Sequence, residues 1–158
     1  HIPRNSNTPA VIRRFIEDWG SHTGRVFVYG DATGGARGTA QTEGSDWDLV
    51  RRELFSHFGP ERTHFRVPKA NPTERSRLNA VNTRLRSGDG TVRMMVDPVT
   101  APMTVKDFEC VRLLAGGSGE IDKKADSKLT HLTDGLGYYV ISEFPVRKKP
   151  IFTQKVHL

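Results

Sequence analysis

The amino-acid sequence predicts an α/β domain in which helices cover both faces of a mixed, mainly parallel sheet. Segments with apolar residues at helical spacing alternate along the chain with short segments typical of strands, which is the pattern of an α/β fold. The composition, with 35% hydrophobic and 27% charged residues, is that of a globular protein, and 158 residues fit one domain. The sequence contains no internal repeat and no long low-complexity tract.

Two helices and two strands are predicted in the first half of the chain. Thr8 and Pro9 provide an N-cap and a first-turn proline, and Gly20 ends the apolar helical pattern that follows them. The apolar run VFVYG shows no alternation, which is typical of a strand buried on both faces. The predicted elements are a helix over 8–19, a strand over 26–30, a helix over 46–58 capped by Ser45, and a strand over 63–67.

Three helices and one strand are predicted in the second half. A helix over 73–86 places Leu78, Val81 and Leu85 on its inward face, and the sequence SGDG after it is typical of a turn. The remaining elements are a strand over 92–96, a helix over 104–114, a glycine-rich and charged connection over 115–130, and a helix over 130–142. We expect one domain over residues 1–146, followed by a basic extension over residues 147–158.

The chain is basic, with 24 Lys and Arg against 18 Asp and Glu, a net charge of +6 and a sequence pI near 9.8. This surplus favours polyanionic partners, with nucleic acid ahead of an anionic membrane surface. No apolar run approaches the ~20 residues of a membrane span, so no membrane partner is expected. Cys110 is the single cysteine, which excludes a disulfide framework and predicts an intracellular protein. We expect Cys110 to pack in the core.

The strand over 26–30 leads directly to Asp31 and a glycine-rich segment, DATGGARG. This segment has neither the Lys-Ser/Thr pair of a Walker loop nor the glycine spacing of a dinucleotide-binding loop. In α/β sheets, ligands bind beyond the carboxyl ends of the strands, which makes Asp31 a candidate metal ligand. The alternative is that Asp31 only starts an Asx turn.

The segment THLTDGLGYYVI carries the second candidate. On a helix, His131, Asp134 and Tyr138 share one face, and the two internal glycines predict a close approach of the helix backbone to a strand. That approach would bring Asp134 near Asp31, and two adjacent carboxylates need a cation between them. Hard oxygen ligands of this kind suit Mg²⁺ or Mn²⁺. The alternatives are a solvated Asp134 near a helix start and His131 as a cap or surface hydrogen-bonder.

The helix over 73–86 also carries a polar stripe opposite its apolar face. Its members recur at helical spacing and are Arg75, Asn79, Asn82 and Arg86. Such a stripe can follow the phosphates of nucleic acid, and a merely solvated helix face is the alternative.

Six blocks of the chain, taken in order, carry a family resemblance. The blocks are VFVYGDATGGARGT, SDWDLV, NPTERSRLNAVNTRLRSGDGTVRMMVDP, KDFECV, IDKK and HLTDGLGYYVISEFP, and together they span most of residues 5–146. They resemble the C-terminal nuclease domain of bacteriophage terminase large subunits. The resemblance implies a ribonuclease H-like fold and a two-metal endonuclease that cuts concatemeric phage or prophage DNA during genome packaging. It places the metal-binding acids at Asp31 and Asp134, in agreement with the argument from the residues.

In the site that the resemblance implies, two divalent ions about 4 Å apart activate a water and stabilise the leaving 3′ oxygen of a phosphodiester. Asp31 and Asp134 would hold the ions, and His131 or Lys124 would orient water or a phosphate. The residues expected to contact DNA are Arg37, Arg75, Asn79, Asn82 and Arg86. The expected partners are double-stranded DNA, other terminase subunits and the portal protein, in the cytoplasm of a bacterial host.

The sequence departs from the family pattern in one respect. Family members carry a further catalytic carboxylate on the first strand of the domain, before the helix that corresponds to residues 8–19, and an ATPase motor domain. The chain starts after that strand, so we expect a partial nuclease domain in which Mg²⁺ binding is millimolar or absent. The alternatives are a catalytically disabled DNA- or portal-binding fragment, and an unrelated α/β protein in which Asp31 and Asp134 never meet.

Overall fold

A computed structural model describes residues 7–35, 44–112, 114–116, 121–122 and 129–146. The chain divides into two compact units, His1–Pro72 and Thr73–Leu158. The predicted basic extension, residues 147–158, lies outside the described residues. One nuclease domain over residues 1–146 stays a prediction.

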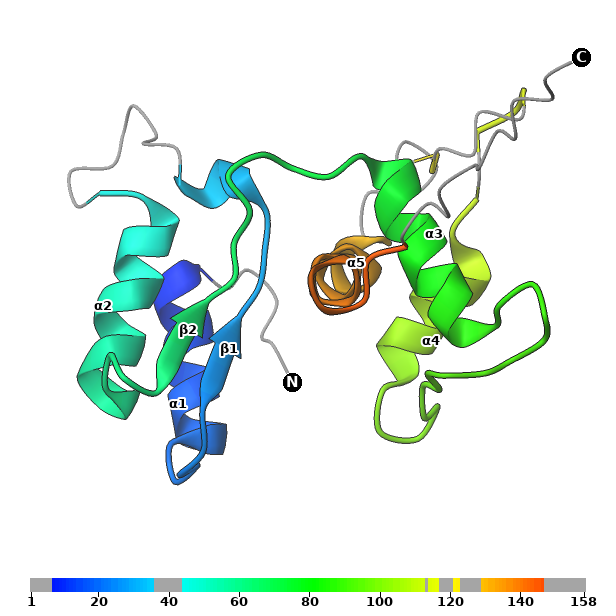
Figure 1. The fold of residues 1–158 in the computed structure, drawn as a ribbon. Coiled ribbons are helices and arrows are strands. Elements are labelled where there is room, and N and C mark those ends of the chain that lie inside the picture. Colours follow the sequence, from blue (N-terminus) through cyan, green and yellow to red (C-terminus); the bar gives the residue numbers. More distant parts are fainter. Residues whose placement is uncertain (1–6, 36–43, 113, 117–120, 123–128, 147–158) are drawn as a thin grey trace, which may run out of the picture. The chain divides into compact units, whose positions relative to one another are not determined.

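The first unit combines a parallel pair of short strands with two helices (Figure 1). Strand β1 (Val26–Val28) pairs with strand β2 (Thr63–Phe65) in parallel. Helices α1 (Thr8–Trp19) and α2 (Asp46–Phe58) pack against each other, and a 3-10 turn over Ala32–Gly35 follows β1. The two predicted helices and the parallel sheet are confirmed, and each strand ends two residues earlier than predicted.

The starts of both helices follow local sequence chemistry. The N-cap of α1 is Asn7 and not Thr8, because the Asn7 side-chain oxygen accepts a 3.0 Å hydrogen bond from Ala10 N. Ser45 caps α2 as predicted and forms a capping box with Asp48. In this box Asp48 N donates to the Ser45 hydroxyl oxygen at 3.2 Å, and Ser45 N donates to the Asp48 carboxylate at 3.0 Å.

The core of the first unit lies between the two helices and one face of the sheet. Its buried residues are Ile12, Val26, Leu54 and Phe58. Because side chains alternate along a strand, Val26 and Val28 face this core, while Phe27 points to the opposite face. There the Phe27 ring stacks on His64 with 5.2 Å between ring centres. Both helices therefore cover the same face, and the predicted cover on both faces is not found among the described residues of this unit.

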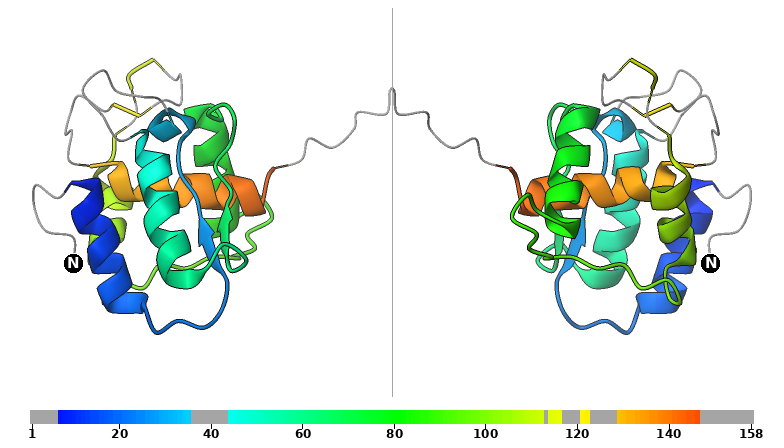
Figure 2. Two further views of the ribbon diagram at one scale, coloured as in Figure 1. Left: turned by 90° about the vertical axis from the view of Figure 1, so that its left-hand side faces the viewer. Right: turned by 90° about the vertical axis from the view of Figure 1, so that its right-hand side faces the viewer.

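The second unit is built around three helices: α3 (Glu74–Leu85), α4 (Pro102–Cys110) and α5 (His131–Glu143). Helix α5 packs against both α3 and α4 (Figure 2). The buried core residues are Ala80, Val81 and Val140, surrounded by Leu85, Met94, Phe108, Leu136 and Ile141. The predicted helices over 73–86 and 130–142 are confirmed within one residue at each end, and two of the three predicted inward residues of α3 lie in this core.

Helix α4 is displaced toward the N-terminus of its predicted range, 104–114. It begins at Pro102, because a proline in the first helical turn lacks only an N–H that would be unpaired there anyway. It ends at Cys110, since Val111 has an extended backbone (φ −67°, ψ 128°). The prediction that Cys110 packs in the core is wrong, because the residue closes the helix and is exposed there.

The predicted strand over 92–96 does not form among the described residues. Arg93 N donates to Arg84 O at 2.9 Å, and Met94 packs against the helical core. A strand needs a neighbouring strand to pair with, and the neighbours of this segment are helices. The mainly apolar segment VRMMV therefore lacks, among the described residues, the neighbouring strand that it would need to form a strand itself.

Two aspartates close turns in the second unit. Asp89 accepts hydrogen bonds from the Ser87 hydroxyl (2.5 Å) and Thr91 N (3.0 Å). Both bonds lower the pKa of Asp89, and the bond from Ser87 has the larger effect. Asp97 accepts bonds of 2.9 Å from Val99 N and from the Thr100 hydroxyl, and they lower the pKa of Asp97 in the same way. The predicted turn after the helix over 73–86 is thus confirmed.

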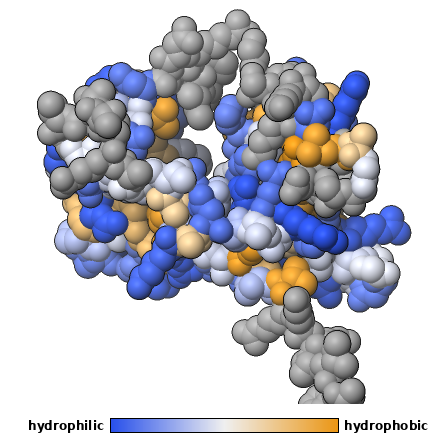
Figure 3. Space-filling model, turned by 90° about the horizontal axis from the view of Figure 1, so that it is seen from above, coloured by the Kyte–Doolittle hydropathy of each residue, from blue (hydrophilic) through white to orange (hydrophobic). Residues whose placement is uncertain are grey.

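The described residues form a mixed α/β structure with five helices and a small parallel sheet, which confirms the α/β class. Hydrophilic residues occupy most of the coloured face in Figure 3, and apolar residues show there as smaller separate patches. Within the described ranges, none of the helices combines the length and the apolar character needed to cross a bilayer.

Candidate functional site

The carboxylate of Asp31 caps the turn that follows β1. Its Oδ1 accepts hydrogen bonds from Thr33 N (2.8 Å), the Thr33 hydroxyl (2.5 Å) and Gly34 N (3.0 Å). Ala32 N donates to Asn71 Oδ1 at 2.7 Å, which ties the turn to the segment after β2. The Asx turn, which the sequence analysis gave as the alternative interpretation of Asp31, is therefore present. The role of Asp31 as a metal ligand stays a prediction.

An indole ring holds the other side of this turn. Trp47 of α2 donates from Nε1 to the backbone oxygen of Asp31 at 2.9 Å. A Cβ atom at Gly30 would lie 2.5 Å from the Trp47 ring, and one at Gly34 would lie 2.7 Å from its Nε1. Only glycine leaves room for the ring at these two positions. Gly30 and Gly34 therefore leave the space that the Trp47 ring occupies.

Asp134 lies in the first turn of α5 and forms an ion pair with Arg77 of α3. Nη1 of Arg77 is 3.0 Å from Oδ1 of Asp134, and the two side chains are only 10% and 28% exposed. The guanidinium carbon of Arg77 also lies 4.4 Å from the centre of the Tyr138 ring, one turn further along α5. Asp134 is thus not the freely solvated residue of the alternative interpretation, because its charge is compensated inside the unit.

Arg77 is one of the residues of this site that the sequence analysis missed. The available signal was its spacing, since it precedes Val81 by four residues and therefore shares the inward face of α3. A Cβ atom at Gly137 would lie 3.4 Å from Arg77 Cβ, within ordinary van der Waals contact, so α5 and α3 lie close together at this point. The predicted close approach exists, but the neighbour is helix α3 and not a strand. Nε of Arg77 is buried and has no hydrogen-bond partner within the described part of the chain.

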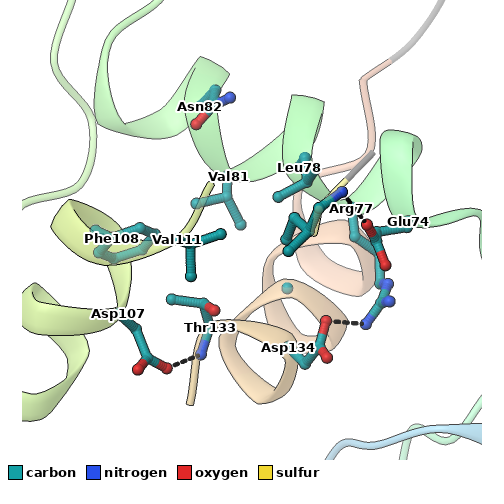
Figure 4. Close-up of a pocket in the computed structure, with 12 residues that line it drawn as sticks. Glu74, Arg77, Leu78, Val81, Asn82, Asp107, Phe108, Val111, Thr133 and Asp134 are labelled. Atoms are coloured by element: carbon teal, nitrogen blue, oxygen red, sulfur yellow. Dashed lines mark hydrogen bonds and ion pairs between the residues drawn. The ribbon is translucent and has the colours of Figure 1, made fainter. Parts of the chain in front are cut away.

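Arg77 and Asp134 line a cavity of about 160 Å³ in the second unit (Figure 4). Its other polar walls are Glu74, Asn82, Asp107 and Thr133, and its apolar walls include Leu78, Val81, Phe108, Val111 and Ile121. Carboxylate and hydroxyl oxygens are the donors that Mg²⁺ and Mn²⁺ prefer, so the donor chemistry fits the predicted ion. Among the residues that the structure describes, no group of three or more His, Cys, Asp or Glu side chains is arranged to hold a metal ion.

Asp107 of α4 closes the beginning of α5. Thr130, the residue before α5, has a left-handed φ of 90° and makes no side-chain cap. Instead, Oδ2 of Asp107 accepts hydrogen bonds from Leu132 N (3.3 Å) and Thr133 N (3.4 Å). Backbone N–H groups in a first helical turn have no partner within their own helix. Asp107, itself 3% exposed, therefore positions the turn that carries Asp134.

Replacing Asp107 by alanine is expected to destabilise the second unit by about 1–3 kcal/mol, since two N–H groups would lose their acceptor in a buried place. Hydrogen exchange at the Leu132 and Thr133 amides should accelerate about tenfold or more. Asp107→Asn is the control, because it keeps an acceptor oxygen and should have a smaller effect. Unchanged exchange at both amides in the alanine variant would show that Asp107 does not cap α5.

The other predicted site residues are exposed or lie outside the described ranges. His131 is the first residue of α5 and is exposed. All four members of the polar stripe are exposed, as expected for a face opposite the core: Arg75, Asn79, Asn82 and Arg86. Arg37 and Lys124 lie outside the described residues. DNA contact by these side chains stays a prediction.

Asp31 belongs to the first unit and Asp134 to the second, so their shared site stays a prediction. Comparisons with protein-family models, curated proteins and solved structures found no match to the chain. The resemblance to terminase nuclease domains therefore rests on the six sequence blocks.

Proposed function

We propose that the chain is part of a phage or prophage terminase large subunit, whose ribonuclease H-like nuclease domain cleaves concatemeric double-stranded DNA with Mg²⁺ or Mn²⁺. The observation that carries the proposal is the placement of the two acids. Asp31 follows the carboxyl end of a parallel strand, and Asp134 stands in the first turn of α5. Ligands of α/β sheets bind beyond the carboxyl ends of strands, which supports Asp31 as a ligand. The net charge of +6 supports a polyanionic substrate.

Each proposed metal ligand is held by neighbours from its own unit. Trp47 fixes the backbone at Asp31, and Asp107 fixes the first turn of α5, which carries Asp134. When bound, a pair of divalent ions activates the attacking water and stabilises the leaving 3′ oxygen. Arg75 and Arg86, both exposed, would hold the phosphate backbone without contacting base edges. An endonuclease with little sequence preference needs contacts of this kind.

The test is cleavage of supercoiled plasmid DNA by the full chain in millimolar Mn²⁺. Asp31→Asn and Asp134→Asn are each expected to reduce the cleavage rate by at least about 10²-fold, because even the partners of metal ligands contribute 10–100-fold. Asp97→Asn is the matched control, since it removes a carboxylate that only closes a turn in the second unit. Cleavage that persists in both site variants, or that falls equally in the control, would contradict the proposal.

A second candidate function is DNA binding without nuclease activity. The ion pair between Arg77 and Asp134 favours it, because an internally neutralised carboxylate attracts a cation less strongly. A binding module of this kind would retain DNA in the presence of a chelator, with an affinity that falls steeply as salt increases, and would not cut it in Mn²⁺. Retention and cleavage measured on the same plasmid separate the two functions.

A further inference from the structure

Another hollow of the second unit combines two arginines with an exposed aromatic ring. It lies between α3 and the C-terminal end of α5 and has a volume of about 490 Å³, within the range of about 300–1,000 Å³ typical of ligand sites. Its described walls include Thr83, Arg84, Arg93, Glu143 and Phe144. It shares no lining residue with the cavity around Arg77 and Asp134, so it is a separate place on the molecule.

The local backbone brings the two arginines together. Arg84 lies in the last turn of α3, and the turn after this helix leads the chain back, so that Arg93 N donates to Arg84 O at 2.9 Å. Nη1 of Arg93 donates to the Ser87 hydroxyl oxygen at 2.9 Å. Within the described ranges, neither guanidinium forms an ion pair with a carboxylate. Two neighbouring guanidinium groups of this kind attract an anion.

Positive charge prevails around this hollow. Its walls carry the charges of two arginines against that of one acid, Glu143. The pKa of Asp89 is lowered first by the hydrogen bond from Ser87 and least by the charge of Arg93, so Asp89 is a weak counter-charge for that arginine. In the sequence, three further basic residues follow Val146: Arg147, Lys148 and Lys149. These charges favour a phosphate-bearing ligand.

Phe144, the first residue after α5, adds a stacking surface. The guanidinium carbon of Arg84 lies 3.9 Å from the centre of the Phe144 ring, and the Tyr139 ring meets Phe144 edge-on with 6.1 Å between ring centres. Phe144 is nevertheless 39% exposed. Proteins stack unpaired bases on exposed aromatic rings and on guanidinium planes. Arg84 and Phe144 together therefore form a platform for a base.

We propose that this hollow binds single-stranded nucleic acid, with one base stacked on Arg84 and Phe144 and a neighbouring phosphate bound by Arg93. A single strand fits better than a duplex, because the bases of a duplex are stacked on one another. The net charge of +6 favours a strand over a free nucleotide, which offers the same base and phosphate. The inference goes beyond the proposed function, since it involves neither Asp31 nor Asp134 and needs no metal ion. Either can therefore fail without the other.

The test is the fluorescence anisotropy of a labelled oligothymidine of about 10 nucleotides, titrated with the full chain in the presence of a chelator. Phe144→Leu keeps an apolar side chain but removes the ring. It is expected to weaken binding at least about fivefold, the lower end of the loss for one stacked base. Phe15→Leu is the matched control, because Phe15 is a similarly exposed ring of the first unit, at 38%. The control should change the affinity less than about twofold.

The salt dependence of binding tests the phosphate contact. For single strands, the logarithm of the affinity falls with the logarithm of the salt concentration by about 0.7 for each neutralised phosphate. Arg93→Gln should therefore reduce this slope by about 0.7. Arg13→Gln, which removes an exposed arginine of α1, should leave the slope unchanged. Equal slopes for the two variants would show that Arg93 binds no phosphate.

Three results would overturn the assignment of a single strand. Phe144→Leu and Phe15→Leu would bind the oligothymidine equally well if no base stacks on Phe144. A blunt duplex of the same sequence that loses as much affinity in Phe144→Leu would show that the ring contacts the backbone and not a base. Thymidine monophosphate that displaces the oligothymidine at an equal concentration of nucleotide would identify a site for free nucleotides.

A measurement on the unsubstituted chain covers the case in which Phe144→Leu does not fold. The ring protons of the phenylalanines are followed by nuclear magnetic resonance while oligothymidine is added. A stacked base adds its ring current, so the Phe144 signals should move upfield as the site fills, and those of Phe15 should stay constant. Phe144 signals that do not move at saturating oligothymidine would contradict the stacking of a base.

Discussion

Replacing Phe58 by alanine is expected to destabilise the first unit by about 3–5 kcal/mol. The Phe58 side chain is 1% exposed and lies in the core between the helices and the sheet. Its ring makes edge contacts with Phe15 at 6.0 Å and with His57 at 4.7 Å between ring centres. Truncation would remove these contacts and leave a cavity in a small core, where few neighbouring side chains can move to fill it.

Urea unfolding followed through the amide resonances of α2 would measure this loss. Phe15→Ala is the control, because the Phe15 ring is 38% exposed and its removal opens less of the core. The control should cost about 1–2 kcal/mol, since only part of its apolar surface is withdrawn from water. Equal losses for the two variants would show that the core of this unit is not centred on Phe58.

Removing Arg77 is expected to destabilise the second unit by about 3 kcal/mol, near the lower end of the cost of breaking a buried ion pair. The lower end applies because Asp134 is 28% exposed, so water partly stabilises the carboxylate that is left behind. Arg77→Ala also loses the contact with the Tyr138 ring. Hydrogen exchange at the amide of Val140, a residue of α5 that is 0% exposed, would report the opening of this unit.

A double-mutant cycle isolates the ion pair from the other losses. Asp134→Asn in the Arg77→Ala background removes the carboxylate charge that Arg77 faces, so the double variant should be about 1–3 kcal/mol more stable than the sum of the single effects predicts. Additive effects would show that Arg77 contributes through packing alone and that its ion pair with Asp134 adds nothing to stability.

The helices were predictable because their signals are local. Capping residues mark the starts of α1, α2 and α3, and the observed bounds of these helices and of α5 agree with the predicted ones within one residue. The segment over 92–96 shows the limit of this approach. Its residues, VRMMV, are mainly apolar, but strand formation depends on a neighbouring strand, and Met94 instead packs against a helical core.

In the candidate site, too, local features were predictable from the sequence and long-range contacts were not. The Asx turn at Asp31 was foreseen as an alternative, because Thr33 and Gly34 lie within three residues of the carboxylate they bind. Arg77 and Asp107 were not foreseen, since both act on residues that are distant in the sequence. Asp107 accepts hydrogen bonds from amides 25 and 26 positions away. Such roles are created by helix packing, and no local pattern encodes them.

The position of Trp47 beside the turn at Asp31 makes its fluorescence a probe of that turn. Its indole N–H is bonded to the carbonyl of Asp31, and its ring lies against the positions of Gly30 and Gly34. Any ligand that rearranges this turn changes the surroundings of the chromophore and hence its fluorescence. Trp19, the other tryptophan, is 60% exposed and contributes a steady, water-like emission. Whether a cation binds at Asp31 can therefore be tested by fluorescence, without a label.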